Sequence, residues 1–322
     1  MRSPASAVVV IAVAFTSLSS IIIRLSTAPA LVIASWRMII ASVILLAIGG
    51  ILRGVPRGAV RKRDVSGDDG RDIAPGSREA REGKTRRILL VIGSGVFLAA
   101  HFAGWISSLE LTSVLHSTVL VTVHPVIVLF GTAIIYRRRP GTRRIVLTIT
   151  ALAGAILLST GGSISGRPPT VAGDALAFLG AVAVAVYLMI GGWARRSLSA
   201  VKYNIAVHSV AAVVLVVATR TSGFPLFGYP IREYVLFGAL AFFCTILGHS
   251  LMNWALAHVD ASDVSVAILL EPIFASTIAA YLFEEIPGVR TLGGAAVVLI
   301  SLGALAVLAG RREYAKGVPK TR

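Results

Sequence analysis

Apolar residues fall in long runs along this chain, separated by short polar or Gly/Pro-rich gaps. Runs at 8–23, 31–52, 114–136, 201–218 and 295–309 are each 15 to 23 residues long. A helix needs about 20 apolar residues to cross a hydrocarbon core about 30 Å thick. The pattern therefore predicts an all-α membrane protein with ten transmembrane helices, at about 6–23, 30–52, 87–107, 114–136, 144–161, 172–194, 201–219, 234–257, 262–283 and 290–309.

The composition agrees with a protein that crosses a membrane many times. Hydrophobic residues make up 56% of the 322 residues, charged residues 14%, and the mean hydropathy is +0.83, whereas soluble domains carry about 25% charge. The net charge is +16, but the basic residues lie in gaps too short for a nucleic-acid-binding domain. Anionic headgroups of the lipid bilayer are therefore the expected partner, rather than nucleic acid. The single Cys244 lies in an apolar run, which argues against disulfides and thiolate metal sites, and no cofactor is expected.

Lys and Arg are distributed unevenly between alternate gaps. With the N-terminus in the cytoplasm, 25 of the 31 basic residues fall on the cytoplasmic side and five on the outer side. The positive-inside rule then predicts that both termini are cytoplasmic, which requires an even number of helices. The one long gap, 53–87, carries 11 basic and six acidic residues without apolar periodicity. We expect a disordered or loosely folded cytoplasmic insert, and favour a solvated linker over a regulatory role.

The chain repeats itself at an offset of 147 residues, which relates Pro125 to Pro272 and one Pro-Gly pair to another. The repeat divides the protein into a first unit, 1–163, a second unit, 164–310, and a basic cytoplasmic tail, 311–322. Because each unit has five predicted helices, an odd number, the second unit must enter the membrane upside down relative to the first. Inverted repeats enclose a site near the bilayer midplane that can open to either side. This symmetry favours a transporter over an enzyme that acts chemically on its substrate.

Three groups of residues carry a resemblance to a known family. They are the stretch 248–257 with the following Glu271-Pro272 and 284–287, the pair Trp36-Arg37 with Ala41, and Gly173-Asp174 with Ala177. With the helix count and the duplication, they resemble the EamA-type transporters of the drug/metabolite transporter superfamily over nearly the whole chain outside 53–87. The resemblance implies a multi-pass protein of the prokaryotic plasma membrane that exports or exchanges small metabolites, often amino acids, without an ATP site. In the first unit the family's Glu-Pro is replaced by His124-Pro125, so the two halves differ electrostatically.

Three ionisable residues deep inside the predicted helices are the first candidates for a substrate-binding or coupling site. Glu271 lies about nine residues into its helix, roughly 13 Å deep, where it could carry a proton, bind a substrate amine, or brace a bend at Pro272. His124 occupies the position that the repeat relates to Glu271, so it could form a coupled pair with Glu271 or be a satisfied buried histidine. Arg37 could clamp a substrate carboxylate or pair with carbonyls at a neighbouring helix end.

Other residues could add contacts in a mostly apolar pocket, although Trp and His near helix ends are also common interface anchors. These candidates are His101 and Trp105 on one face of the third helix, His249 and Asn253 on the eighth, and, with less weight, Tyr187 and His208. Glu284 and Glu285 lie near the predicted outer face, where we expect a solvated cap. The chain has no Walker-type stretch, which argues against direct ATP drive, and its histidine spacings do not favour a metal site.

These features favour a secondary transporter that exports or exchanges a small metabolite, with an amino acid as the first candidate, by alternating access. Proton coupling through Glu271 is an open option. The alternatives are a multidrug or organic-cation efflux transporter, and an intramembrane enzyme that acts on lipid through His101, His249 and Glu271. Against the enzyme, the polar residues are sparse and spread over both halves. A homodimer is also open.

Overall fold

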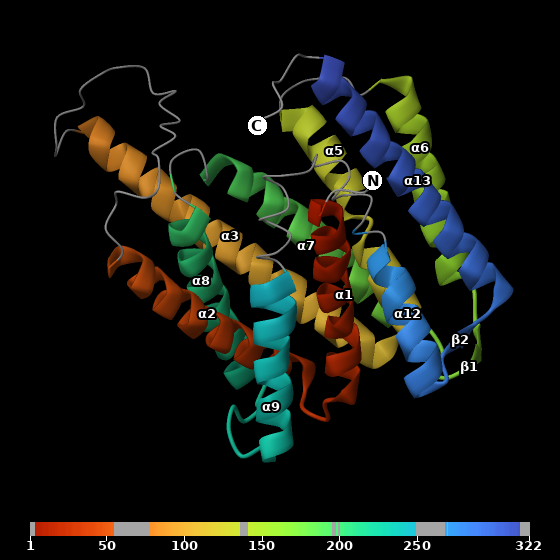
Figure 1. Ribbon diagram of the computed structural model, residues 1–322, viewed down its shortest axis with the longest axis horizontal. Helices are drawn as coiled ribbons and strands as arrows, with labels where there is room; N and C mark the ends of the chain where they lie inside the picture. Colours follow the sequence, from red (N-terminus) through yellow and green to blue (C-terminus); the bar gives the residue numbers. More distant parts are fainter. Residues whose placement is uncertain are drawn as a thin grey trace.

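The computed structural model describes residues 4–54, 78–135, 141–194, 198, 200–248, 268 and 270–315, and this part of the chain is almost wholly helical. The helices are α1 (Pro4–Leu25), α2 (Ala30–Gly54), α3 (Arg78–Leu111), α4 (Val114–Val121), α5 (His124–Ile135), α6 (Thr142–Ser159), α7 (Val171–Ala194), α8 (Ala200–Thr221), α9 (Ile231–Ala239), the π-helix η2 (Leu240–Gly248), α12 (Leu270–Phe283) and α13 (Val289–Ala315). Two short antiparallel strands, β1 (Ser163–Ser165) and β2 (Ile286–Pro287), pair between the ends of α6 and α12. Figure 1 shows the helices as one bundle.

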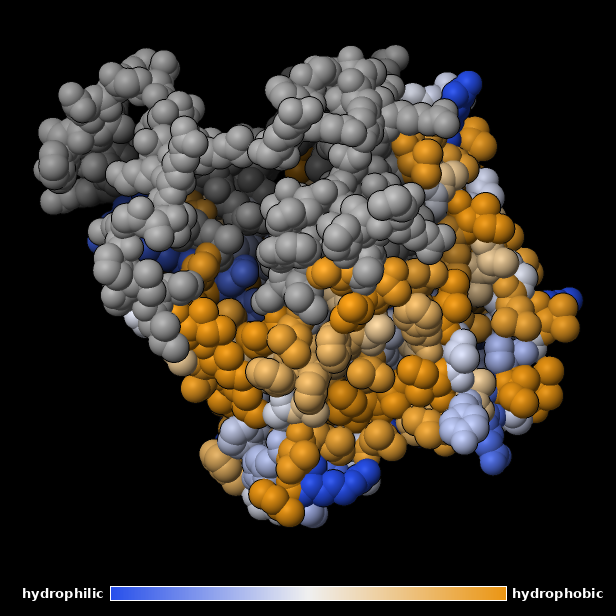
Figure 2. Space-filling view, in the orientation of Figure 1, coloured by the Kyte–Doolittle hydropathy of each residue, from blue (hydrophilic) through white to orange (hydrophobic). Residues whose placement is uncertain are grey.

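Eight helical segments among the described residues are long and apolar enough to cross a membrane, and two shorter apolar helices, Leu270–Phe283 and Val289–Leu305, accompany them. A multi-pass membrane protein is therefore confirmed, while the full set of ten spans stays a prediction. Figure 2 shows a broad apolar surface above polar side chains at the lower edge of the molecule. Such a surface suits contact with lipid tails. Helices suit the same environment, because they pair their backbone groups internally.

The long charged gap is shorter than the sequence suggested. Helix α3 begins at Arg78, so 78–87, which we expected to be part of a disordered insert, is helical. The stretch is rich in Arg, Glu, Ala and Lys, which favour helix, and Glu82 precedes Arg86 by four positions, a favourable spacing for opposite charges. The prediction was therefore wrong for these ten residues, and 55–77 lie outside the described part.

The predicted span 114–136 is broken between α4 and α5. Pro125 has no N–H to bond the carbonyl of Val121, four residues before it. The ring Nδ1 of His124 lies 3.0 Å from that carbonyl oxygen and donates a hydrogen bond to it. The side chain next to the proline thus satisfies the backbone group that the proline leaves free.

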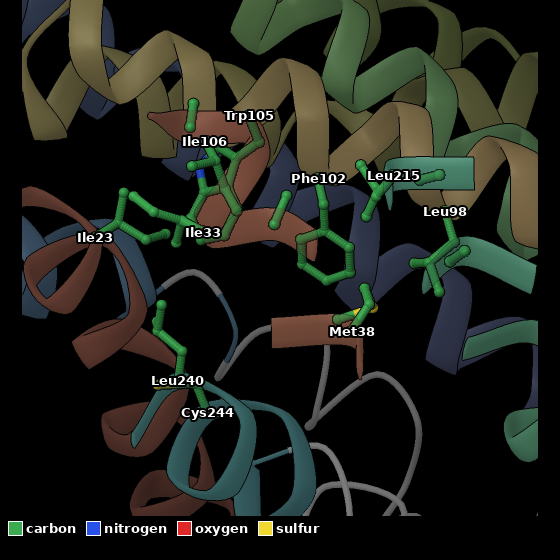
Figure 3. Close-up of a cluster of buried hydrophobic side chains, with 14 of the residues drawn as sticks. Ile23, Ile33, Met38, Leu98, Phe102, Trp105, Ile106, Leu215, Leu240 and Cys244 are labelled. Carbon is green, nitrogen blue, oxygen red and sulfur yellow. The ribbon is translucent and has the colours of Figure 1, made fainter. Parts of the chain in front are cut away.

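Small residues allow the closest helix contacts. On α3, a Cβ at Gly104 would lie 3.0 Å from the carbonyl oxygen of Leu176, and on α7 a Cβ at Gly180 would lie 3.3 Å from the backbone nitrogen of Trp105. Helices α3 and α7 therefore pack backbone to backbone, as is common in membranes. The larger core cluster lies among α1, α2, α3, α8, α9 and α12, and Figure 3 shows Phe102 and Trp105 inside it.

Many connections lie together at one end of the bundle, along the lower edge of Figure 1, which we call the loop end. It comprises 26–29, 112–113, 160–170, 222–230 and 284–288. Hydrogen bonds join these connections, for example from the backbone nitrogen of Gly288 to the carbonyl of Gly162 at 2.8 Å. By the distribution of basic residues, this is the end that we expect to face the outside.

Candidate functional site

Arg37 is the most deeply buried cation in the described helices and is 2% exposed. Its Nε donates to Oγ1 of Thr245 at 2.9 Å, and its Nη1 donates to Oγ of Ser19 at 2.8 Å. The guanidinium carbon lies 4.5 Å from the ring centre of Phe102 and 5.9 Å from that of Trp105. One side chain of α2 thus contacts α1, α3 and η2 through hydrogen bonds and cation–π contacts.

The π-helix η2 places Thr245 for this contact. Its hydroxyl also donates to the carbonyl of Leu240, five residues earlier, at 3.3 Å. This i to i+5 spacing is that of a π-helix, which is rare and is often found at functional sites. Thr245 therefore accepts from Arg37 and donates to its own helix, which fixes the orientation of its oxygen.

Glu271 from α12 joins the same group of polar side chains. Its carboxylate lies within electrostatic range of Arg37 and near the hydroxyl of Thr16 on α1. A carboxylate inside a membrane protein is stable only when it is paired, protonated or hydrated, and here a guanidinium and a hydroxyl lie near it. We call Thr16, Ser19, Arg37, Thr245 and Glu271 the central polar cluster. The structure thus brings together Arg37 and Glu271, two of the three ionisable residues chosen from the sequence.

The aromatic residues of α3 cover one side of the cluster. His101 and Trp105 stack with ring centres 6.0 Å apart and an interplanar angle of 6°, and the rings of Phe102 and Trp105 both face the guanidinium of Arg37. The Nδ1 of His101 lies 3.0 Å from the carbonyl oxygen of Gly180, so this residue joins α3 to α7. Trp105 is buried, and among the described residues its Nε1 has no hydrogen-bond partner.

The remaining candidates are placed differently. His124 bonds the carbonyl of Val121 within its own broken helix, and a Glu271–His124 pair stays a prediction. Tyr187 is partly buried against the larger core cluster, and His208 interacts electrostatically with Arg37 while its Nδ1 lies 2.8 Å from the carbonyl oxygen of Asn204. His249 and Asn253 lie outside the described residues.

Sequence reasoning missed the polar partners of Arg37. Thr16 and Ser19 lie on α1 among further buried serines, Ser17 and Ser20. Four hydroxyl residues within five positions of an otherwise apolar helix were a usable signal for a polar face, because such groups seek partners inside the membrane. Phe102 had no comparable signal, since a phenylalanine in a span is ordinary.

The expectation for Glu285 was wrong. This residue is 5% exposed rather than a solvated cap, and it pairs with Arg24 and accepts from the backbone nitrogen of Val114 at 2.8 Å. The N-terminus of α4 attracts a carboxylate because its first N–H groups have no partner inside the helix. No local sequence pattern indicates a pair between residues 261 positions apart.

A second buried pair lies close to Glu285. The Nδ1 of His116 is 3.1 Å from both carboxylate oxygens of Asp174, and the hydroxyl of Thr112 donates to the same carboxylate at 2.9 Å. The Nε2 of His116 lies 3.4 Å from Oγ1 of Thr291. This network joins α4 to the start of α7 and to α13. It gives both buried ionisable groups hydrogen-bond partners.

An α-helical bundle with an apolar surface and eight helical segments long enough to cross a bilayer among its described residues is typical of a multi-pass membrane protein. Comparison with known proteins agrees: the model of the EamA-like transporter family matches residues 4–160 and 171–307. The chain therefore belongs to the EamA-like transporter family. The family points to a membrane transporter of small substrates rather than an enzyme.

Two individual proteins are similar to the chain. The uncharacterized transporter YyaM of Bacillus subtilis (strain 168) is 24% identical over 283 residues, which cover 85% of this chain and 84% of that protein. A protein of known crystal structure superposes with a TM-score of 0.59 at 16% identity, over 97% of this chain and 99% of that one. The second likeness concerns the fold alone.

Proposed function

We propose that this protein carries a small zwitterionic metabolite, with an amino acid as the first candidate, across the membrane by alternating access. The observation that carries the proposal is the central polar cluster, in which one buried cation, Arg37, and one partly buried acid, Glu271, come from different halves of the chain. An amino acid presents one carboxylate and one ammonium group, which match these two charges. The buried position suits a carrier, because a substrate must leave water on one side before it reaches the other.

The helix contacts support a duplicated architecture. If the five helices of the second half correspond in order to those of the first, α1 corresponds to α7, α2 to α8, α3 to α9 with η2, α4 and α5 to α12, and α6 to α13. Helix α1 packs on η2 and α12, and correspondingly α7 packs on α3 and on α4 and α5. Helices α2 and α8 correspond to each other, as do α6 and α13. In both cases the two corresponding helices pack against each other. These pairs of contacts are related by exchange of the halves, which supports the proposed duplication.

The chain directions support inversion of the second unit. Helix α1 ends at the loop end, at Leu25, whereas its counterpart α7 begins there, after the connection 160–170. Antiparallel counterparts are what an odd number of spans per unit requires. The division into units 1–163 and 164–310 agrees with the two segments matched by the family model, 4–160 and 171–307.

An amino acid is favoured over an organic cation by the aromatic side chains. The faces of Phe102 and Trp105 are already occupied by the guanidinium of Arg37. A cationic substrate would compete with Arg37 for these faces and be repelled by its charge. A carboxylate would instead add a partner for the guanidinium, which has five N–H donors in total.

Transport is tested by counterflow of labelled solutes into proteoliposomes that contain the purified protein. We expect counterflow of at least one amino acid, and its loss in Arg37→Gln with the protein still monodisperse. The matched control is Arg143→Gln, which changes the charge by the same amount at the exposed start of α6. Counterflow of organic cations without any amino acid would refute the substrate class, and turnover of a lipid without solute flux would refute transport.

The orientation, coupling and partners complete the proposal. Both termini face the cytoplasm, and the basic gaps contact anionic headgroups. Glu271 binds and releases a proton during the transport cycle. Reactivity of an added terminal tag toward an impermeant reagent in intact cells tests the orientation. A homodimer stays a prediction, tested by the mass of the detergent-solubilised protein.

A further inference from the structure

A nearly buried ion pair at the loop end joins Arg24 to Glu285, whose side chains are 11% and 5% exposed. Arg24 lies in the last turn of α1, and Glu285 lies two residues beyond the end of α12. Besides Arg24, the carboxylate of Glu285 binds the backbone nitrogen of Val114, at the start of α4, at 2.8 Å. The two oxygens of this carboxylate therefore hold α1 and α4 at the same time.

Arg24 extends the contact to α3. Its Nη1 donates to the carbonyl of Leu109 at 2.9 Å and lies 3.5 Å from that of Thr112. Its guanidinium carbon lies 5.3 Å from the ring centre of Phe283, at the end of α12. One ion pair thus joins the loop-end termini of α1, α3 and α4, in the first half, to that of α12, in the second half.

Neighbouring carboxylates at the loop end hold other connections. Glu233, at the start of α9, accepts from the backbone nitrogen of Thr27 at 3.2 Å and from its hydroxyl at 3.0 Å, and also binds Ser26. Glu110, near the end of α3, accepts from the backbone nitrogen of Ala30 at 2.8 Å. These two acids hold the connection between α1 and α2, and Glu233 holds it to α9 of the second half, whereas Glu285 joins α1 and α4 to the end of α12.

We propose that Arg24 and Glu285 are the latch of a gate at the loop end. This inference rests on the proposed alternating access, in which the halves separate at one end of the bundle at a time. With the latch formed, the loop-end termini of α1, α3, α4 and α12 are held in contact, so a substrate cannot pass there. Opening at this end separates α12 from α1 and α4, and both charged groups then become hydrated.

Removal of one charge of the pair destabilises the latched state much more than the open state. Loss of one partner leaves the other charge buried and unpaired in the latched state, which is costly. In the open state the remaining charge contacts water, where it has little need of a partner. Glu285→Gln therefore shifts the population toward the open loop end. A change of about tenfold in the ratio of the two states corresponds to about 1.4 kcal/mol.

The latch is tested without any substrate by distances between spin labels across the pair. The labels replace Leu111 on α3 and Tyr281 on α12, which are 40% and 87% exposed, in a Cys244→Ala background reconstituted in lipid. We expect Glu285→Gln to increase the fraction of long distances about tenfold. Glu284→Gln is the matched control, because it removes the same charge from the exposed neighbouring residue. An unchanged distribution in Glu285→Gln, or an equal shift in both variants, would overturn the latch.

A second pair of variants keeps the test decisive if Glu285→Gln is not monodisperse. Arg24→Gln removes the other charge and should give the same shift. In Arg24→Cys/Glu285→Cys, a short bifunctional thiol reagent should abolish counterflow of the transported solute, and a reductant should restore it. Counterflow that persists in fully cross-linked protein refutes the latch. A distance shift in protein that moves no solute, cross-linked or not, supports the latch and refutes the proposed transport.

Discussion

Replacement of Arg37 by lysine keeps the buried positive charge and removes the geometry of its contacts. In arginine, Nε donates to Thr245 while Nη1 donates to Ser19. Lysine has a methylene near the position of Nε, so its single ammonium group can keep the contact with Ser19 but not the one with Thr245. The plane that lies over the ring of Phe102 is lost as well. The substitution therefore removes one charge-assisted hydrogen bond and one stacked contact, and leaves the net charge near Glu271 unchanged.

The expected cost follows from these two contacts. A hydrogen bond to a charged group contributes about 1.5–3 kcal/mol, and a cation–π contact shielded from water contributes roughly 1 kcal/mol or more. Arg37→Lys should thus lower the free energy of unfolding by about 2–4 kcal/mol. Thr245→Val removes the other partner of the bond and should cost about 1–3 kcal/mol, because it leaves the Nε of Arg37 without an acceptor.

The assay is a double-mutant cycle on protein in mixed micelles, with the free energy of unfolding of wild type, Arg37→Lys, Thr245→Val and the double variant measured by denaturant titration. Because both substitutions break the same hydrogen bond, the double variant should be more stable than the sum of the single effects predicts, by about 1–3 kcal/mol. Effects that add to within about 0.5 kcal/mol would refute the contact between α2 and η2. Ser42→Ala is a control, since its hydroxyl bonds within α2.

Three further predictions concern other parts of the site. Glu271→Gln should leave folding intact and remove the pH dependence of transport, which is measured as counterflow across a pH series; an unchanged pH profile would contradict proton coupling at this residue. His124→Ala should lower the stability by about 1–3 kcal/mol, because the carbonyl freed by Pro125 loses its partner, while counterflow keeps its pH profile; a changed profile would instead favour a titrating role. Gly180→Val should disrupt the packing of α3 on α7, where even a Cβ would be tight, and lower the thermal midpoint, whereas Gly238→Ala should have little effect, since a Cβ there meets nothing within 4 Å.

The membrane fold was accessible from the sequence because its physical cause is local. A run of about 20 apolar residues is sufficient evidence for a span, so the starts and ends of α1, α2 and α7 lie within two residues of the prediction. The break after α4 was less accessible, because a proline in a membrane helix can bend it without ending it. The helical start of α3 at Arg78 was missed since apolar periodicity is the wrong signal for a polar helix extension.

The site was only partly accessible, because its contacts are between distant segments. The choice of Arg37 and Glu271 followed from their depth in apolar runs, since charges there must find partners. Which partners they find depends on how the helices cross, and no local pattern pairs Arg37 with Thr245, 208 positions away. The same reason explains the wrong expectation for Glu285. A glutamate next to a loop is usually solvated, and only the arrival of Arg24 and of the N-terminus of α4 makes its burial favourable.

In the proposed transport cycle, the central polar cluster and the Arg24–Glu285 ion pair have different roles. Apolar helix surfaces slide past one another at little cost in lipid, because the tails are as apolar as the side chains. Buried charges cannot be displaced at such low cost. Each charge is stable either when it contacts its partner or when it is hydrated, and arrangements between these two are costly. In that cycle, the central polar cluster and the proposed loop-end latch both join the first half of the chain to the second through charged side chains. A bundle whose halves are held by apolar packing alone would open gradually, whereas contacts of this kind would give it discrete closed and open states.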